Sequence, residues 1–85
     1  MTLKWRCSYG SYHASTDDHS YIVFRDFDHP KIWVSQYHDL SEGMLVLCGH
    51  KMYHPVPGPL ALSRREAQRK AEEHADTPKE DLYQP

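Results

Sequence analysis

Short stretches of alternating apolar and polar side chains occupy the first half of the chain, and this alternation is typical of β-strands with one buried face. Every second residue from Leu3 to Tyr9 is apolar, so residues 3–9 are expected to form a strand that buries this side. Residues 12–14 either continue that strand or form a short strand of their own. Further strands are predicted at residues 21–25, which are rich in β-forming residues, and at residues 31–37 and 44–48.

The strand expected at residues 31–37 has large side chains on both faces. Ile32 and Val34 share one face, and Trp33 and Tyr37 share the other. The pattern therefore leaves open which of the two faces is buried.

The segment that follows is more uniformly apolar. Residues 44–48 indicate a central strand or one covered on both faces. Gly49 and His50 suit a type II′ hairpin turn, with a returning strand at residues 51–54. Residues 55–59 contain three prolines and are expected to end the sheet as a stiff, extended linker.

A helix is predicted at residues 63–75. Ser63 and Glu66 have the spacing of a capping box, in which the serine side chain caps a free N–H group and the glutamate reaches back to the cap residue. Leu62 before the cap and Ala67 after it are placed to form a hydrophobic staple.

The apolar face of this helix consists of small residues, because Ala67, Ala71 and Ala75 recur every fourth position. Such a narrow stripe allows a helix to approach a sheet closely. The fold predicted from these elements is α+β: a three- to five-stranded antiparallel sheet followed by one C-terminal helix packed on it.

The chain has 85 residues, which predicts a single domain over residues 1–85. The sheet is expected over about residues 3–54, followed by the linker at 55–59, the helix at 63–75 and a short tail at 76–85. Aromatic residues make up 12% of the chain, so a few large rings can build its core. The segment at the start has no apolar stretch of signal-peptide length, and the longest aliphatic run is Met44 to Leu47. We therefore expect a cytoplasmic protein with reduced cysteines and no membrane partner.

Charge and motifs favour binding over catalysis. Lys and Arg total 10 against 12 Asp and Glu, a net charge of −2, which is not the basic footprint of a dedicated nucleic-acid binder. The chain has no nucleophile elbow, no Gly-rich phosphate loop and no paired catalytic motif, so we expect no enzyme activity and no cofactor.

One combination of side chains has the chemistry of a metal site: Cys7, Cys48, His50 and His54 supply the sulfur and nitrogen ligands that zinc prefers. The usual Cys-x2-Cys spacing is missing, however, and cysteines on strands are usually buried as small hydrophobic side chains. We therefore predict that no metal is bound.

Carboxylates gather in the predicted loops between residues 17 and 42, where two basic residues oppose six acidic ones and the local balance is −4. Aromatic side chains lie nearby in the sequence. Carboxylates with aromatic anchors suit contact with a basic protein surface, such as one that normally holds nucleic acid. The alternative interpretation is that these loops are simply polar. The candidate partner-binding residues are Asp17, Asp18, Asp26, Asp28, Trp33 and Tyr37.

DNA binding is the weaker alternative. A sheet followed by a helix is also the plan of plant AP2-type and integrase arm-type DNA-binding domains, and the segment Leu62–Ala71 resembles their helix. Such domains need several Arg and Lys on the exposed sheet face, but residues 1–60 carry only five basic residues against six acidic ones. Arg64, Arg65, Arg69 and Lys70 cluster on the helix between glutamates, which is also the pattern of a solvated helix face.

The segment Ser63–Ala71, with its Leu-Ser-x-x-Glu-Ala run followed by Ala-rich charged turns, resembles the C-terminal helix of many small sheet-plus-helix proteins of bacteriophages and prophages. Anti-CRISPR proteins are one such group. The resemblance implies an accessory protein that inhibits or modulates a host or defence protein by stoichiometric binding. It implies no individual functional residue, and self-association as a homodimer is left open.

Overall fold

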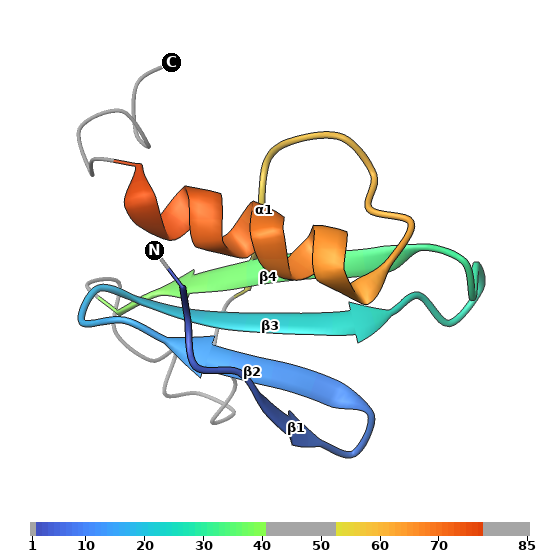
Figure 1. Ribbon diagram of the computed structural model, residues 1–85, viewed down its shortest axis with the longest axis horizontal. Coiled ribbons are helices and arrows are strands. Elements are labelled where there is room, and N and C mark those ends of the chain that lie inside the picture. The colour runs from blue at the N-terminus through green and yellow to red at the C-terminus, as the bar shows by residue number, and fades with distance from the viewer. Residues whose placement is uncertain (1, 41–52, 78–85) are drawn as a thin grey trace, which may run out of the picture.

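The structure is a computed structural model that describes residues 2–40 and 53–77. It contains the strands β1 (Arg6–Ser8), β2 (Ser11–Ser15), β3 (His19–Arg25), β4 (Trp33–Asp39) and β5 (His54–Pro55), and the helix α1 (Arg64–Asp76). The strands pair antiparallel in the order β1-β2-β3-β4-β5, and α1 lies across one face of the sheet (Figure 1). The predicted α+β fold is confirmed. The strand expected at 44–48, its hairpin turn and most of the tail lie outside the described residues.

The start of the chain differs from the prediction, because only Arg6–Ser8 of the expected strand 3–9 is in the sheet. Leu3 is buried at 7% exposure, and its N–H donates to Oε2 of Glu72 on α1 at 2.9 Å. Cys7 and Tyr9 are exposed, since α1 packs on β3 and β4 and leaves β1 uncovered. The prediction that Leu3, Trp5, Cys7 and Tyr9 are all buried is therefore wrong for Cys7 and Tyr9.

Residues 12–14 belong to a strand of their own, which a tight turn joins to β1. Tyr9 and Gly10 form this turn between the paired residues Ser8 and Ser11, with φ angles of 52° and 78°. Two central residues with positive φ are what a type I′ hairpin turn requires, and glycine adopts that conformation without a steric penalty.

The central strands β3 and β4 pair over their whole length, from His19 opposite Asp39 to Arg25 opposite Trp33. They are longer or later than the predicted strands by about two residues, the usual error at element ends. The loop between them is closed by backbone hydrogen bonds. The N–H of Asp26 donates to the carbonyl of Ile32 at 2.9 Å, and the N–H of Ile32 donates to the carbonyl of His29 at 2.8 Å.

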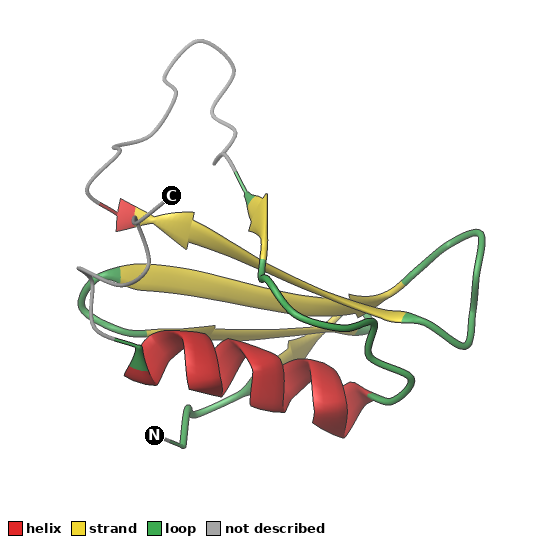
Figure 2. Cartoon of the chain, turned by 90° about the horizontal axis from the view of Figure 1, so that it is seen from above, coloured by secondary structure: helices red, strands yellow, loops and turns green. Residues whose placement is uncertain are grey.

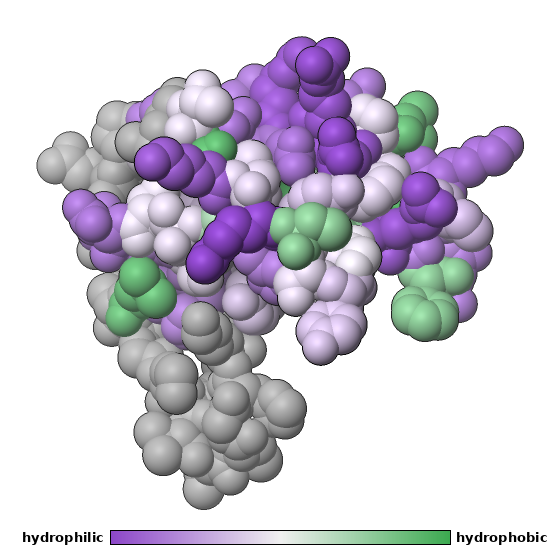
Figure 3. All heavy atoms as spheres, turned by 60° about the horizontal axis from the view of Figure 1, so that its bottom comes forward, coloured by the Kyte–Doolittle hydropathy of each residue, from purple (hydrophilic) through white to green (hydrophobic). Residues whose placement is uncertain are grey.

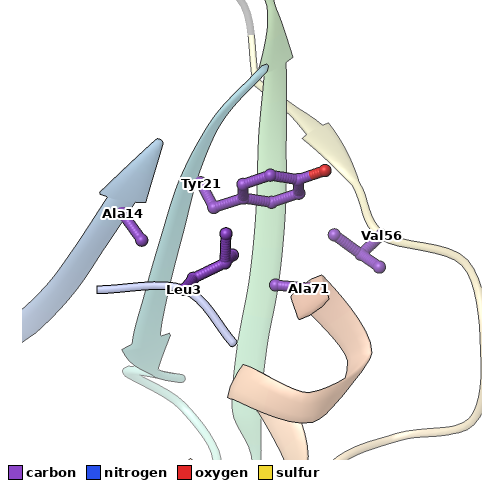
Figure 4. Close-up of a cluster of buried hydrophobic side chains, with 5 residues drawn as sticks. All are labelled: Leu3, Ala14, Tyr21, Val56 and Ala71. Carbon is purple, nitrogen blue, oxygen red and sulfur yellow. The ribbon is translucent and has the colours of Figure 1, made fainter. Parts of the chain in front are cut away.

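The core lies between the sheet and α1 in two adjoining clusters. The first consists of Leu3, Ala14, Tyr21, Val56 and Ala71, shown in Figure 4. The second consists of Val23, Ala61 and Ala67, and Trp5 packs against both clusters. Trp33 and Tyr37 pack half-buried against these clusters, which answers the question that the sequence left open: their face of β4 is the one covered by the helix.

The segment predicted as a linker is part of the sheet and the core. Pro55 pairs with Gln36 in the edge strand β5, where its missing N–H is tolerated. Val56 is 4% exposed and donates its N–H to the carbonyl of Ser35 at 2.9 Å. Trp33 donates its N–H to the carbonyl of Ala61, also at 2.9 Å. Figure 2 shows the chain following β4 on its way to the start of α1.

The helix begins at its predicted cap, and the N–H of Glu66 donates to Oγ of Ser63 at 3.2 Å. The carboxylate of Glu66 reaches back one residue further than expected, and Oε2 accepts the N–H of Leu62 at 2.9 Å. Leu62 is 68% exposed, so the predicted hydrophobic staple does not form. Ala67 and Ala71 are fully buried against the sheet, as the alanine stripe predicted.

Candidate functional site

Among the described residues, most of the large exposed apolar side chains lie at one end of the molecule. The turn between β1 and β2, the loop between β3 and β4 and the start of α1 all lie at the right in Figure 1. We call this the hairpin end and define it by residues 9–12, 25–33 and 58–65. Large apolar side chains on these segments are open to solvent, with exposed fractions of 105% for Tyr9, 100% for Phe27, 71% for Leu60 and 68% for Leu62.

The hairpin end also holds a basic hollow of about 530 Å³. Its side chains come from the end of β3, the start of β4, the strand β2 and the first turn of α1. We call it the arginine hollow, and its lining residues are Tyr12, Arg25, Trp33, Ser63, Arg64 and Arg65.

Two of the three guanidinium groups in the arginine hollow lie on aromatic rings. The guanidinium carbon of Arg64 is 4.8 Å from the ring centre of Tyr12, and Nη1 donates to the Tyr12 hydroxyl at 2.8 Å. The guanidinium carbon of Arg25 is 5.1 Å from the ring of Trp33, and the two ring centres are 6.3 Å apart. Among the described residues, no carboxylate forms an ion pair with Arg25, Arg64 or Arg65. Within the described part of the chain, no ion pair therefore offsets the positive charge of the hollow.

The predicted acidic residues do not form one surface. Asp17 and Asp18 lie in the loop before β3, whereas Asp26 and Asp28 lie in the loop after it. A strand rises roughly 3.3 Å per residue, so the seven residues of β3 separate the two pairs by about 23 Å. Of the six candidates, only Asp26, Asp28 and Trp33 share the hairpin end. Tyr37 packs toward the other end of the sheet, against the first core cluster.

The uncovered face of the sheet carries little positive charge. The register that turns Tyr12, Val23 and Ser35 toward α1 turns His13, Ile22 and Gln36 away from it. Among the described strands, Arg6 is the one Lys or Arg on that face. Figure 3 shows a face on which apolar side chains form separate patches among hydrophilic ones. A sheet that reads a DNA groove needs more cations than this.

A buried polar cluster lies near the other end of α1. The hydroxyl of Tyr21 and Nδ1 of His74 are 2.7 Å apart, and the rings of Tyr37 and His19 lie 4.3 and 5.2 Å from that of His74. Burial raises the pKa of Tyr21 well above its usual value. The pKa of His74 is lowered from 6.5 to about 4, first by burial and then by the charge of His19, while Asp39 acts in the opposite direction. Both partners are therefore neutral near pH 7.

The hydrogen bond between Tyr21 and His74 has a structural role and not a catalytic one. Tyr21 is 0% exposed and His74 is 5% exposed, so a substrate has no path to the hydrogen bond between them. The sequence analysis missed His74, although it extends the stripe of Ala67 and Ala71 by a further three positions, the spacing of a residue on the same helix face. It also missed the arginine hollow, which is assembled from four separate segments.

The combination considered for a metal is separated in space. Cys7 lies on β1 and His54 on β5, at opposite edges of the sheet, which strand spacing puts about 19 Å apart. One ion binds its ligands within about 2.3 Å and cannot hold both. Cys48 and His50 lie outside the described residues. Within the part of the chain that the structure describes, no three potential ligands come together.

Comparison with protein-family models, curated proteins and solved structures gave no match to this chain. The helix of the described residues lacks the length and apolar character needed to cross a membrane. Function is therefore inferred from the surfaces of the molecule itself.

Proposed function

We propose that this protein acts by stoichiometric binding to a protein partner through the hairpin end, and not by catalysis. The observation that carries this proposal is the distribution of exposed apolar side chains. Of the five large ones on the described residues, Tyr9, Phe27, Leu60 and Leu62 lie at the hairpin end, and Leu40 lies at the opposite end.

The composition of the hairpin end fits a protein interface. Aromatic residues and arginine are enriched at such interfaces, and a few buried rings usually supply most of the binding energy. A phenyl ring as open as that of Phe27 gains about 25 cal/mol per Å² of apolar surface when a partner covers it. Asp26, Asp28 and the arginine hollow then supply charges of both signs around these apolar contacts.

The identity of the partner rests on resemblance. The likeness of Ser63–Ala71 to phage and prophage proteins supports a host or defence protein, which the chain would inhibit or modulate. Cys7 is free and exposed, which fits a reducing compartment such as the cytoplasm. DNA binding stays the alternative, with the arginine hollow in its favour. A salt titration with random duplex DNA tests it, because phosphate contacts make affinity fall steeply with salt.

The test of the proposal compares the two ends of the molecule. The immobilised protein captures its partner from an extract of the cells that encode it, and calorimetry with the purified partner gives the dissociation constant and the stoichiometry. We expect the double variant Phe27→Ser, Leu62→Ser to bind at least about tenfold more weakly. The matched control is Leu40→Ser, which removes an exposed leucine from the other end. Equal affinities for the two variants would contradict the proposal.

A further inference from the structure

We propose that the arginine hollow is a phosphoryl-binding site that takes a phosphorylated side chain of the protein partner. The inference rests on the proposed function, because it names the chemistry of the partner that meets the hairpin end. The geometry behind it is the convergence of Arg25, Arg64 and Arg65 from two separate elements on one open hollow.

The three guanidinium groups suit a phosphoryl group better than a single carboxylate. A phosphate monoester carries a charge between −1.5 and −2 near neutral pH and has three strongly accepting oxygens. One planar guanidinium fork already matches both oxygens of a carboxylate, whereas further arginines find acceptors on a phosphoryl group. Because no described carboxylate pairs with Arg25, Arg64 or Arg65, a ligand displaces no internal ion pair.

Two of the head groups are already held in place. Arg64 is fixed by its contact with the Tyr12 ring and by the hydrogen bond to the Tyr12 hydroxyl, and Arg25 lies over Trp33. Ordering a long side chain is one of the main losses on binding, so arginines that are held before the ligand arrives bind it more tightly. Arg65 is exposed and stacks on neither ring, so it can close over a bound ligand from the rim.

A protein ligand fits the surroundings better than single-stranded nucleic acid. Nucleic-acid channels offer open ring faces on which bases stack. Here Arg64 and Arg25 cover one side of Tyr12 and Trp33, and both rings pack half-buried against the core cluster of Val23, Ala61 and Ala67. Leu62 directly precedes the lining residue Ser63 and is 68% exposed, so it offers an apolar contact to a residue next to the phosphorylated one.

The neighbouring carboxylates point the same way. Asp26 and Asp28 lie in the loop that begins directly after Arg25. A nucleic acid brings further phosphates, which these two aspartates repel. A single phosphoryl group on a protein side chain has no such neighbouring phosphates and avoids this repulsion.

The test uses the whole chain and small probes: N-acetyl phosphotyrosine amide, N-acetyl phosphoserine amide, their unphosphorylated forms and an oligothymidine single strand. Nuclear magnetic resonance follows the side-chain Nε–H signals of the arginines during each titration. We expect the phosphorylated amides to shift the signals of Arg25, Arg64 and Arg65 at millimolar concentration or below. The signal of Arg69, outside the hollow, and all unphosphorylated forms should give no shift.

Substitutions separate the hollow from general positive charge. Arg65→Gln is expected to weaken binding of the phosphorylated amides about tenfold, because it removes charge-assisted hydrogen bonds. It leaves the fold intact, since Arg65 is exposed and has no ring contact. Arg69→Gln removes the same charge from the same helix and should change the affinity less than twofold. Equal losses in the two variants, or no shift with any phosphorylated amide, would overturn the proposal, and so would tighter binding of the oligothymidine strand.

Treatment of the captured partner with a phosphatase distinguishes the two proposals. We expect it to weaken association at least about tenfold. If association is unchanged by the phosphatase but is lost in the Phe27→Ser, Leu62→Ser variant, the phosphoryl site is wrong and the hairpin-end interface stands. If the phosphorylated amides bind the hollow while that double variant associates as well as the wild type, the interface is wrong and the phosphoryl site stands.

Discussion

The hydroxyl of Tyr21 lies 2.7 Å from Nδ1 of His74 and joins the central strand of the sheet to the last turn of the helix. The two residues are 53 positions apart in the sequence, and both are buried. We assign Tyr21 as the donor, because its raised pKa keeps the hydroxyl protonated and the lowered pKa of His74 keeps the imidazole neutral. His74 then accepts at Nδ1 and carries its own proton on Nε2.

Removing this hydroxyl should destabilise the fold. Tyr21→Phe keeps the ring in the core but leaves Nδ1 of a buried histidine without its partner, which costs about 1–3 kcal/mol. Denaturation in urea at pH 7 measures the change in the free energy of unfolding. The matched control is Tyr9→Phe, in which the lost hydroxyl belongs to a fully exposed ring and should change nothing. Equal stabilities of Tyr21→Phe and wild type would show that the hydrogen bond does not hold the helix.

The lowered pKa of His74 predicts acid sensitivity. A group that is harder to protonate in the folded state contributes full stability above its unfolded pKa of 6.5, and this contribution is lost as the pH falls toward its folded pKa of about 4. The loss is at most about 3 kcal/mol over that window. We expect the free energy of unfolding of the wild type to fall between pH 6.5 and 4.5 more steeply than that of His74→Gln. His29→Gln removes an exposed histidine instead and should keep the steep dependence.

The capping bond between Ser63 and Glu66 predicts a third change in stability. Ser63→Ala removes the acceptor for the N–H of Glu66 and should lower the free energy of unfolding by about 1 kcal/mol. Ser15→Ala, at the exposed end of β2, removes a hydroxyl without a capping role and serves as the control. Thermal melts of the two variants should differ by several degrees, as expected for a domain of this size. Equal melting temperatures of Ser63→Ala and Ser15→Ala would show that the capping bond does not stabilise the fold.

Local patterns predicted those parts of the fold that are determined by neighbouring residues. Runs of β-forming residues located the central strands, and the spacing of Ser63 and Glu66 placed the start of the helix at its cap. The same reasoning failed where a distant contact decides the structure. Leu3 and Val56 are buried because they pack with Tyr21 and Ala71 in the core between the sheet and α1.

The candidate site was harder to predict for the same reason. Arg64 meets Tyr12 across 52 positions, and no periodicity in either segment signals that contact. The sequence analysis counted Arg25 only among the basic residues of the first 60 positions, although its place opposite Trp33 brings it into the arginine hollow. His74 is different: the spacing of the alanine stripe could have placed it on the buried helix face, although the sequence analysis missed it.

The two acidic pairs should behave differently toward a partner, because they lie at opposite ends of β3. Asp28→Lys reverses a charge beside the exposed ring of Phe27 and should change the association rate with the partner several-fold. Asp17→Lys reverses the same charge at the far end and should leave that rate unchanged. Both side chains are exposed, so we expect each change in stability to stay within about 0.5 kcal/mol.

Stopped-flow association at low and moderate salt measures these rates, and the difference between the variants should shrink as salt screens the charges. The direction of the effect also identifies the surface of the partner. Slower association of Asp28→Lys indicates a basic surface, as the acidic loops suggest, whereas faster association indicates an acidic or phosphorylated one that the arginine hollow attracts. A rate change confined to Asp17→Lys would place the contact at the opposite end and would contradict the hairpin-end interface.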